Sequence, residues 1–196
     1  MEMARHNVRE QLLSAGLDTL RRRGFNATSV QDITEAAGVP KGSFYNHFES
    51  KEALGAEAVL KYLGESEAGK GLRALQDTRG APLTRLRKYF ESLTERALKA
   101  ESWSGCMLGN FACELSNQSP LIREQVATAF DTWSNEIALV IGEAQQAGTV
   151  SKELPSKALA AFVVNAWEGA VLRAQVDKDR APLQLFLKIT FSKILA

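Results

Sequence analysis

The sequence has little net charge, few cysteines and histidines, and no long apolar run. Its 24 lysine and arginine residues almost balance its 23 aspartate and glutamate residues, which leaves a formal net charge of +1. No stretch approaches the ~20 apolar residues of a membrane-spanning helix, and the first residues lack the apolar segment of a secretory signal. We therefore expect a cytoplasmic protein with no membrane partner, and the composition does not by itself indicate nucleic-acid binding.

Cysteine and histidine are too scarce for several kinds of site. Two cysteines, Cys106 and Cys113, cannot form a disulfide framework, and no CxxC spacing or histidine–cysteine cluster indicates zinc. The two histidines, His6 and His47, both precede residue 50, so none follows that could activate a thiol. We expect no metal, no cofactor and no catalytic residue. The rival class is a thiol-dependent enzyme that uses Cys106 with one of these histidines.

The apolar residues that are present follow helical spacing. With 196 residues, 45% of them hydrophobic and 24% charged, the chain is long enough for a small domain and a larger one. No alternating strand pattern occurs, so the sequence predicts an all-α protein of about nine helices. The expected helices cover approximately residues 7–23, 29–37, 40–48, 50–62, 83–98, 107–116, 119–148, 156–176 and 182–195.

Residues 28–51 predict two short helices joined by a tight turn. Ser29 and, three residues later, Asp32 form a capping box, in which each side chain accepts a hydrogen bond from the other residue's backbone N–H. Gly38 supplies the left-handed backbone that ends the first helix. Pro40 suits the first turn of the second helix. This spacing is typical of a helix-turn-helix.

Apolar spacing divides each of these helices into two faces. Ile33, Ala36 and Ala37 are expected on the inner face of the first helix. Phe44 and Phe48, four residues apart, face the core from the second. The residues expected to face outward are Lys41, Gly42, Ser43, Tyr45, Asn46 and His47. Because this set can donate and accept hydrogen bonds, the motif predicts DNA binding.

The pattern resembles the DNA-binding signature of the TetR (tetracycline-repressor) family, over the run T-S-V-Q-D-I-T-E-A-A-G-V-P-K-G-S-F-Y-N-H-F-E-S-K-E-A-L at residues 28–54. The resemblance implies a helix-turn-helix domain at 1–50, a connecting helix at 51–64, and an effector-binding and dimerisation domain at 65–196. It also implies a homodimer that binds a double-stranded DNA operator and a small-molecule effector. The DNA contacts it implies are Thr28 and Ser29 near phosphates, Lys41, Gly42 and Ser43 near base edges, Tyr45, His47 and Lys51 on the DNA backbone, and Asn46 as a further base contact.

The last expected helix has two apolar sides. Leu185 and Ile189 lie on one side, and a wider set that includes Leu183, Phe186 and Phe191 lies on the other. A helix with two apolar sides must bury both. The pattern alone fits a last core helix as well as a helix that packs against a second subunit. The resemblance favours the second alternative, because two subunits related by a two-fold axis can bind the two half-sites of a palindromic operator. It assigns Leu185 and Ile189 to the dimer interface.

The run G-C-M-L-G-N at residues 105–110 resembles a subgroup of the same family that includes the N-ethylmaleimide repressor and acrylate-responsive regulators. In the former a cysteine at this place senses electrophiles, so the resemblance makes Cys106 a candidate sensor. The alternative is that Cys106 is a small buried hydrophobe. The subgroup often has a lysine, which would stabilise a thiolate, where this chain has Gln175. A reversible, apolar effector is therefore the companion hypothesis.

Large aromatic residues supply the candidate walls of an effector pocket. The candidate effector-binding residues are Trp103, Cys106, Phe111, Trp133, Phe162, Asn165 and Trp167. They combine aromatic walls with one polar group that could orient a ligand. A helical module without DNA binding is the other alternative to a regulator, but Lys41, Tyr45 and Lys51 are all present. The sequence thus predicts a DNA-binding transcriptional regulator, with repression expected from the family resemblance.

Overall fold

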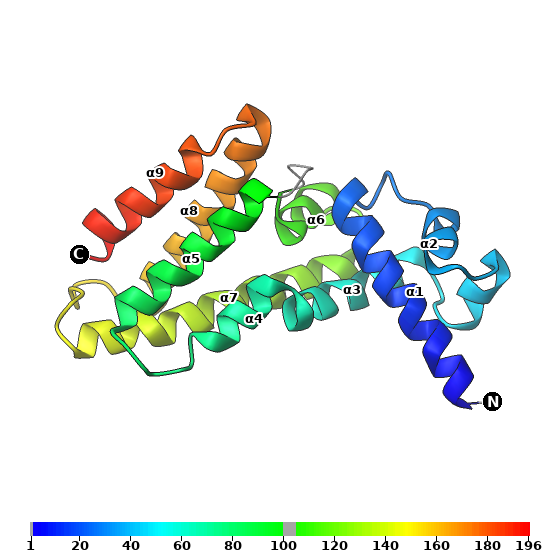
Figure 1. The fold of residues 1–196 in the computed structure, drawn as a ribbon, viewed down its shortest axis with the longest axis horizontal. Coiled ribbons are helices and arrows are strands. Elements are labelled where there is room, and N and C mark those ends of the chain that lie inside the picture. The colour runs from blue at the N-terminus through cyan, green and yellow to red at the C-terminus, as the bar shows by residue number, and fades with distance from the viewer. Residues whose placement is uncertain (1, 100–104) are drawn as a thin grey trace. The chain divides into compact units, whose positions relative to one another are not determined.

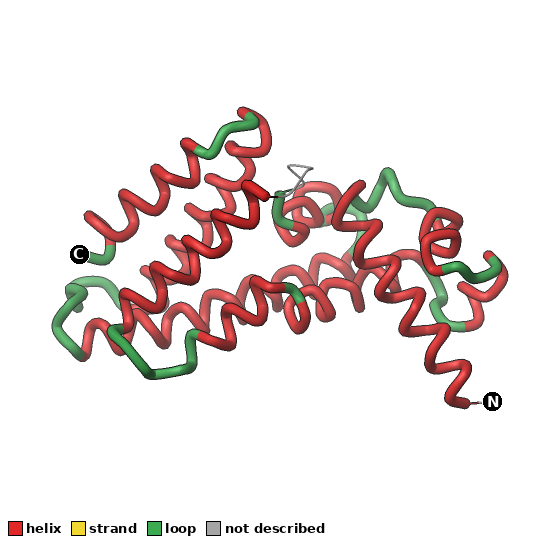
Figure 2. The backbone as a smooth tube through the Cα atoms, in the orientation of Figure 1, coloured by secondary structure: helices red, strands yellow, loops and turns green. Residues whose placement is uncertain are grey.

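The computed structural model describes residues 2–99 and 105–196, and every regular element in them is helical (Figures 1 and 2). This confirms the all-α prediction. The elements are α1 (Glu2–Arg23), α2 (Val30–Ala37), the 3-10 helix η1 (Lys41–Asn46), α3 (Lys51–Glu65), α4 (Glu67–Ala74), α5 (Pro82–Lys99), α6 (Met107–Leu115), α7 (Pro120–Gln146), α8 (Ser156–Asp177) and α9 (Ala181–Ile189), which continues as the π-helical turn η2 (Thr190–Ile194). No helix in these residues is long and apolar enough to cross a membrane.

Contacts within the chain divide it into two compact units. The first comprises residues 1–65 and 106–129, and the second comprises residues 66–105 and 130–196. The sequence placed a domain boundary near residue 65, but it did not predict that α6 and the start of α7 belong with the N-terminal helices. α6 joins them because the ring of Phe111 meets that of Phe25, just after α1, edge to face at 5.7 Å.

The first unit is built around apolar side chains from α1, α2, η1 and α3. Its fully buried members include Leu12, Leu20, Ile33, Phe44 and Leu54, each at most 1% exposed. α1 ends as predicted at Gly24, which has φ of +83° and donates its N–H to the carbonyl of Leu20 at 2.9 Å. A left-handed glycine ends a helix with little steric cost. α1 begins at Glu2, earlier than the predicted start near residue 7.

The inner face of α2 differs from the prediction. Ile33 is buried as expected, but Ala36 is exposed and Ala37 is only half-buried. Thr34 takes the inner position instead and is 1% exposed. Its burial is tolerated because its hydroxyl donates to the carbonyl oxygen of Val30 at 3.1 Å, so no polar atom of the side chain is left without a partner.

The second unit has an aromatic core between α5, α8 and α9. Phe90, Trp167 and Phe186, one from each helix, pack with ring centroids 5.0 to 5.4 Å apart. All three are at most 6% exposed. The short helix α4 follows α3 and contains two glycines, Gly69 and Gly71. Ser66 caps α4 by accepting the backbone N–H of Gly69 at 3.1 Å.

Candidate nucleic-acid interface and effector site

The start of α2 has the predicted capping box. The hydroxyl oxygen of Ser29 accepts the N–H of Asp32 at 3.1 Å, and the carboxylate of Asp32 accepts the N–H of Ser29 at 2.8 Å. Arg23, from the end of α1, donates to the same carboxylate at 2.9 Å. Hydrogen bonds from Ser29, with a smaller contribution from the Arg23 charge, hold the pKa of Asp32 below its ordinary value of 3.8. The cap thus ties α2 to α1.

A left-handed turn and the second, short helix of the motif follow α2. Gly38 has φ of 67°, and its N–H donates to the carbonyl of Glu35. The second helix, η1, is a 3-10 helix rather than the longer helix expected over 40–48. Phe44 and Phe48 nevertheless face inward as predicted, with 0% and 3% exposure. The guanidinium of Arg9 in α1 lies 4.8 Å from the centroid of the Phe48 ring, which braces the end of the motif.

The outward face of η1 is polar and accessible. Lys41, Gly42, Tyr45 and Asn46 are exposed, and Ser43 and His47 are half-buried. Tyr45 is 61% exposed, yet its ring packs edge to face on buried Phe44 at 5.3 Å. The contact anchors an otherwise exposed phenol at its base. The expected DNA contacts of these side chains, and of exposed Ser29, stay predictions.

Two residues expected near DNA phosphates have their polar groups engaged inside the first unit. Thr28 is 1% exposed, and its hydroxyl donates to the carbonyl of Gly24 at 2.7 Å. The half-buried Lys51 donates from its ammonium to the carbonyls of Phe25 at 2.9 Å and Thr28 at 2.7 Å. These contacts give both side chains a role in the fold that the sequence did not indicate.

The candidate sensor cysteine lies at the start of α6. Cys106 is the N-cap residue, with extended backbone, and is half-buried. Cys113 lies on the same helix and is exposed, and neither cysteine forms a disulfide. Phe111 is 1% exposed and packs on Phe25, so it belongs to the core of the first unit. Trp103 lies outside the described residues.

The remaining effector candidates lie in the second unit. Trp133 and Trp167 are each 4% exposed in the second unit, and the ring nitrogen of Trp133 has no hydrogen-bond partner among the described residues. Phe162 is 53% exposed, and Asn165 is also exposed. The candidates thus lie in both units, and their assignment to one effector pocket stays a prediction.

The outer face of α8 and α9 is apolar and exposed. Leu185 and Ile189 of α9 are 59% and 42% exposed, as expected of a side that faces away from the core. On α8, Leu172 and Val176 are 55% and 72% exposed, and they continue the stripe that begins at Phe162. The sequence analysis missed the α8 stripe, although its spacing of ten and four residues was a visible signal.

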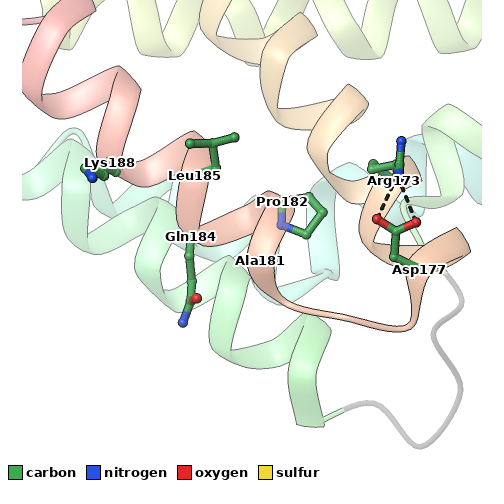
Figure 3. A pocket seen from close by; sticks show the side chains of 7 residues that line it. All are labelled: Arg173, Asp177, Ala181, Pro182, Gln184, Leu185 and Lys188. Atoms are coloured by element: carbon green, nitrogen blue, oxygen red, sulfur yellow. Dashed lines mark hydrogen bonds and ion pairs between the residues drawn. The ribbon is translucent and has the colours of Figure 1, made fainter.

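The same face contains an open groove of about 560 Å³ between the two helices. Its lining residues are Arg173, Asp177, Ala181, Pro182, Gln184, Leu185 and Lys188 (Figure 3). Arg173 donates from Nε to both carboxylate oxygens of Asp177, at 2.8 and 2.7 Å. The two charges therefore neutralise each other along one wall, and Leu185 connects the groove to the apolar stripe.

Comparison with known proteins agrees with this architecture. Residues 12–58 match the family model of bacterial regulatory proteins of the tetR family, and residues 82–190 match the model of tetracyclin repressor-like C-terminal domains. The chain belongs to the TetR family. It is therefore a helix-turn-helix DNA-binding regulator of transcription and not an enzyme, and the rival thiol-enzyme class is set aside.

Individual relatives of this TetR-family protein cover nearly its whole length. It is 37% identical over 193 residues to the HTH-type transcriptional repressor DhaR of Mycobacterium sp. (strain GP1). That alignment covers 98% of this chain and 95% of DhaR. It is 27% identical over 185 residues to the transcriptional repressor NemR of Escherichia coli (strain K12). That alignment covers 91% of this chain and 89% of NemR. A crystal structure of a TetR regulatory protein from Rhodobacter sphaeroides is 32% identical, with a TM-score of 0.84, and the match covers 95% of this chain and 98% of that one.

Proposed function

We propose that this protein is a homodimeric transcriptional repressor that binds a palindromic operator and is released from it by a small effector. The observation that carries the proposal is the motif itself: a capped α2, a left-handed turn at Gly38, and η1 with Lys41, Tyr45 and Asn46 exposed. Repression, rather than activation, is supported by the names of the relatives DhaR and NemR.

The dimer is supported by the exposed apolar face of α8 and α9. A helix as short as η1 contacts only a few base pairs, so a two-fold pair is needed to read a longer palindrome. Soluble monomers rarely leave a contiguous apolar surface of this kind uncovered. A second copy of the chain would cover Leu172 and Val176 with Leu185 and Ile189 in a four-helix packing.

Covalent sensing at Cys106 is one hypothesis for release. The backbone N–H groups at a helix N-terminus favour negative charge, and the thiolate is the nucleophilic form of cysteine. Cys106 is the N-cap residue of α6, so an adduct would form where that helix begins. Cys113, in the middle of the helix, has no such position.

A reversible ligand in the second unit is the second candidate. Trp133 is 4% exposed, and its N–H has no hydrogen-bond partner in the described residues. A buried donor without a partner is costly, and a ligand with an acceptor atom would satisfy it. Trp133 therefore remains the strongest of the sequence-predicted pocket residues.

Selection of DNA tests the proposed function directly. The protein is mixed with a pool of random-sequence duplexes, and bound duplexes are amplified and sequenced over several rounds. We expect a palindrome whose half-sites are about one helical turn or more apart. The matched control is the double variant Lys41→Ala with Tyr45→Ala, which should enrich no palindrome. Enrichment of the same palindrome by this variant would contradict the assignment of η1, and no enrichment by the parent would contradict DNA recognition.

A further inference from the structure

A short turn joins α1 to α2, and we call residues 24–28 the interhelix turn. Within it, Thr28 donates its N–H to the carbonyl of Phe25 at 3.1 Å and its hydroxyl to that of Gly24 at 2.7 Å. Ser29, the N-cap residue of α2, follows directly. The conformation of the interhelix turn therefore sets where α2 begins and, through Gly38, where η1 lies.

α6 contacts the interhelix turn through two side chains. Glu114 accepts the backbone N–H of Asn26 at 2.8 Å through Oε2. Its other oxygen lies 2.6 Å from the place that a Cβ on Gly24 would occupy, so the missing side chain of Gly24 makes room for the carboxylate. Phe111, three residues earlier and on the same helix face, packs its ring against Phe25.

α3 holds the interhelix turn from its carbonyl side. The ammonium of Lys51 donates to the carbonyls of Phe25 and Thr28. One charged group from α3 thus engages two carbonyl oxygens of the turn, while Glu114, a charged group from α6, engages an N–H. Hydrogen bonds with one ionised partner are about twice as strong as neutral ones, so these are the strongest side-chain contacts that the turn makes.

We propose that Glu114 is a positioning residue for DNA recognition, which ties α6 to the start of α2. The proposal rests on the proposed function and adds a route by which α6 acts on the motif. Cys106 caps one end of α6 and Glu114 lies in its last turn, about 12 Å away at ~1.5 Å per residue. A shift of α6 must either carry the interhelix turn with it or break the contact between Glu114 and Asn26.

Positioning and charge predict opposite effects for loss of this carboxylate. Removing a negative charge from a DNA-binding unit, considered alone, strengthens DNA binding because phosphates repel carboxylates. Loss of a positioning contact weakens specific binding, since base contacts need the recognition helix in place. Glu124, exposed on α7 in the same unit, has no side-chain partner in the described residues. Glu124→Ala makes the same charge change and is the matched control.

The experiment compares the parent, Glu114→Ala, Glu114→Gln and Glu124→Ala. Fluorescence anisotropy measures affinity for a duplex that the parent selects from a random pool, and for a shuffled duplex. Glu114→Ala should lose about tenfold in specific affinity with no loss for the shuffled duplex. Glu114→Gln keeps an acceptor oxygen in place and should lose about threefold. Glu124→Ala should bind as the parent does or more tightly.

Three outcomes would overturn the proposal. The first is equal specific affinity of Glu114→Ala and Glu124→Ala. The second is equal loss on both duplexes, which marks a general structural defect. The third applies if Glu114→Ala fails to fold, in which case Glu114→Gln is the deciding variant. Specific affinity of Glu114→Gln equal to that of the parent would then overturn the proposal.

Amide hydrogen exchange at Asn26 is measured without DNA. Exchange should be faster in Glu114→Ala than in the parent and unchanged in Glu124→Ala, and equal rates would refute the contact. This readout holds even if the parent selects no duplex, so failure of the positioning contact is distinguishable from failure of the proposed function.

Discussion

The ammonium of Lys51 lies 4.1 Å from the centroid of the Phe25 ring. It also donates to the carbonyl of that same residue. A cation over the face of an aromatic ring contributes about 0.5 to 2 kcal/mol of stabilising free energy, and the contribution is larger where water is excluded. Lys51 therefore fastens the N-terminus of α3 to the interhelix turn. A phosphate contact by Lys51 would have to compete with these interactions.

We expect Lys51→Met to destabilise the fold while leaving the salt dependence of DNA binding unchanged. Methionine keeps most of the apolar stem but loses two hydrogen bonds from a charged donor, so the free energy of unfolding should fall by about 2 to 3 kcal/mol. Urea titration measures that fall. In operator binding, the slope of log affinity against log salt should equal that of the parent, because the carbonyls of the interhelix turn already hold the ammonium.

The control is Lys88→Met, which makes the same charge change at an exposed position of α5. It should leave the free energy of unfolding nearly unchanged. A salt slope reduced by about 0.9 in Lys51→Met would show that Lys51 neutralises a phosphate, and the phosphate contact implied by the family resemblance would then hold.

Local features of the motif were predictable from the sequence because they depend on a few neighbouring residues. The capping box of Ser29 and Asp32, the helix ends at Gly24 and Gly38, and the inward Phe44 were all found as predicted. Their physical basis is backbone geometry and a spacing of three or four residues.

Contacts between distant segments were not predictable in this way. Glu114 and Asn26 are 88 positions apart, and no local pattern pairs them, so the place of α6 in the first unit was missed. Likewise, the family resemblance implied a DNA-backbone contact for Lys51, and no local pattern indicated its hydrogen bonds to the carbonyls of the interhelix turn. The outward position of Phe162 depends on which face of α8 packs on the core.

Tyr45 and Lys41 should differ in how their loss affects DNA binding. Tyr45→Ala removes an exposed phenol expected at the DNA backbone, so affinity should fall about fivefold for all duplexes, the equivalent of about 1 kcal/mol. Lys41→Ala removes a residue expected at base edges and should relax the preference at one or two positions. Titrations against operators with single base changes measure both. Parent affinity in both variants would refute the DNA contacts of η1.

Asp32 should make the stability of the protein depend on pH in acid. Its folded-state pKa lies below the ordinary value of 3.8, chiefly because of the hydrogen bonds from Ser29. A lowered folded pKa gives stability that is present above the ordinary value and is lost as the pH falls through the folded value. Asp32→Asn should therefore destabilise the protein at neutral pH, and the difference from the parent should shrink below pH 3.8.

Urea titrations across this pH range measure the difference between Asp32→Asn and the parent. Asp131→Asn, at an exposed position of α7, makes the same chemical change and should show no such difference at neutral pH. A difference for Asp32→Asn that stays constant down to pH 2 would contradict a role for the ionised carboxylate in the cap.

Charged residues on the outer face of α9 should produce monomers. Replacing Leu185 and Ile189 with glutamate places like charges at the expected two-fold interface, and dissociation should reduce operator affinity by about a hundredfold or more, since only one half-site is then bound. Sedimentation velocity reads the assembly state. Leu154→Glu is the control because Leu154 is 54% exposed but lies in the segment between α7 and α8, outside the two helices that carry the stripe. A monomeric parent at micromolar concentration would contradict the dimer.

An α,β-unsaturated carbonyl compound or a quinone should modify Cys106 before Cys113 and release the DNA. Accessibility alone favours the opposite order, because Cys113 is exposed and Cys106 is half-buried. The expected order instead follows from the N-cap position of Cys106, where the helix favours the thiolate. Mass spectrometry of peptides after short exposure shows which thiol reacts first.

DNA release measured on Cys106→Ser and Cys113→Ser shows whether the modification matters. Cys113→Ser should release the operator as the parent does, while Cys106→Ser should stay bound. If Cys106→Ser instead responds as the parent does, covalent sensing at this residue is wrong. The unpartnered N–H of Trp133 then makes a reversible ligand in the second unit the working hypothesis, and Trp133→Phe should weaken the response to that ligand.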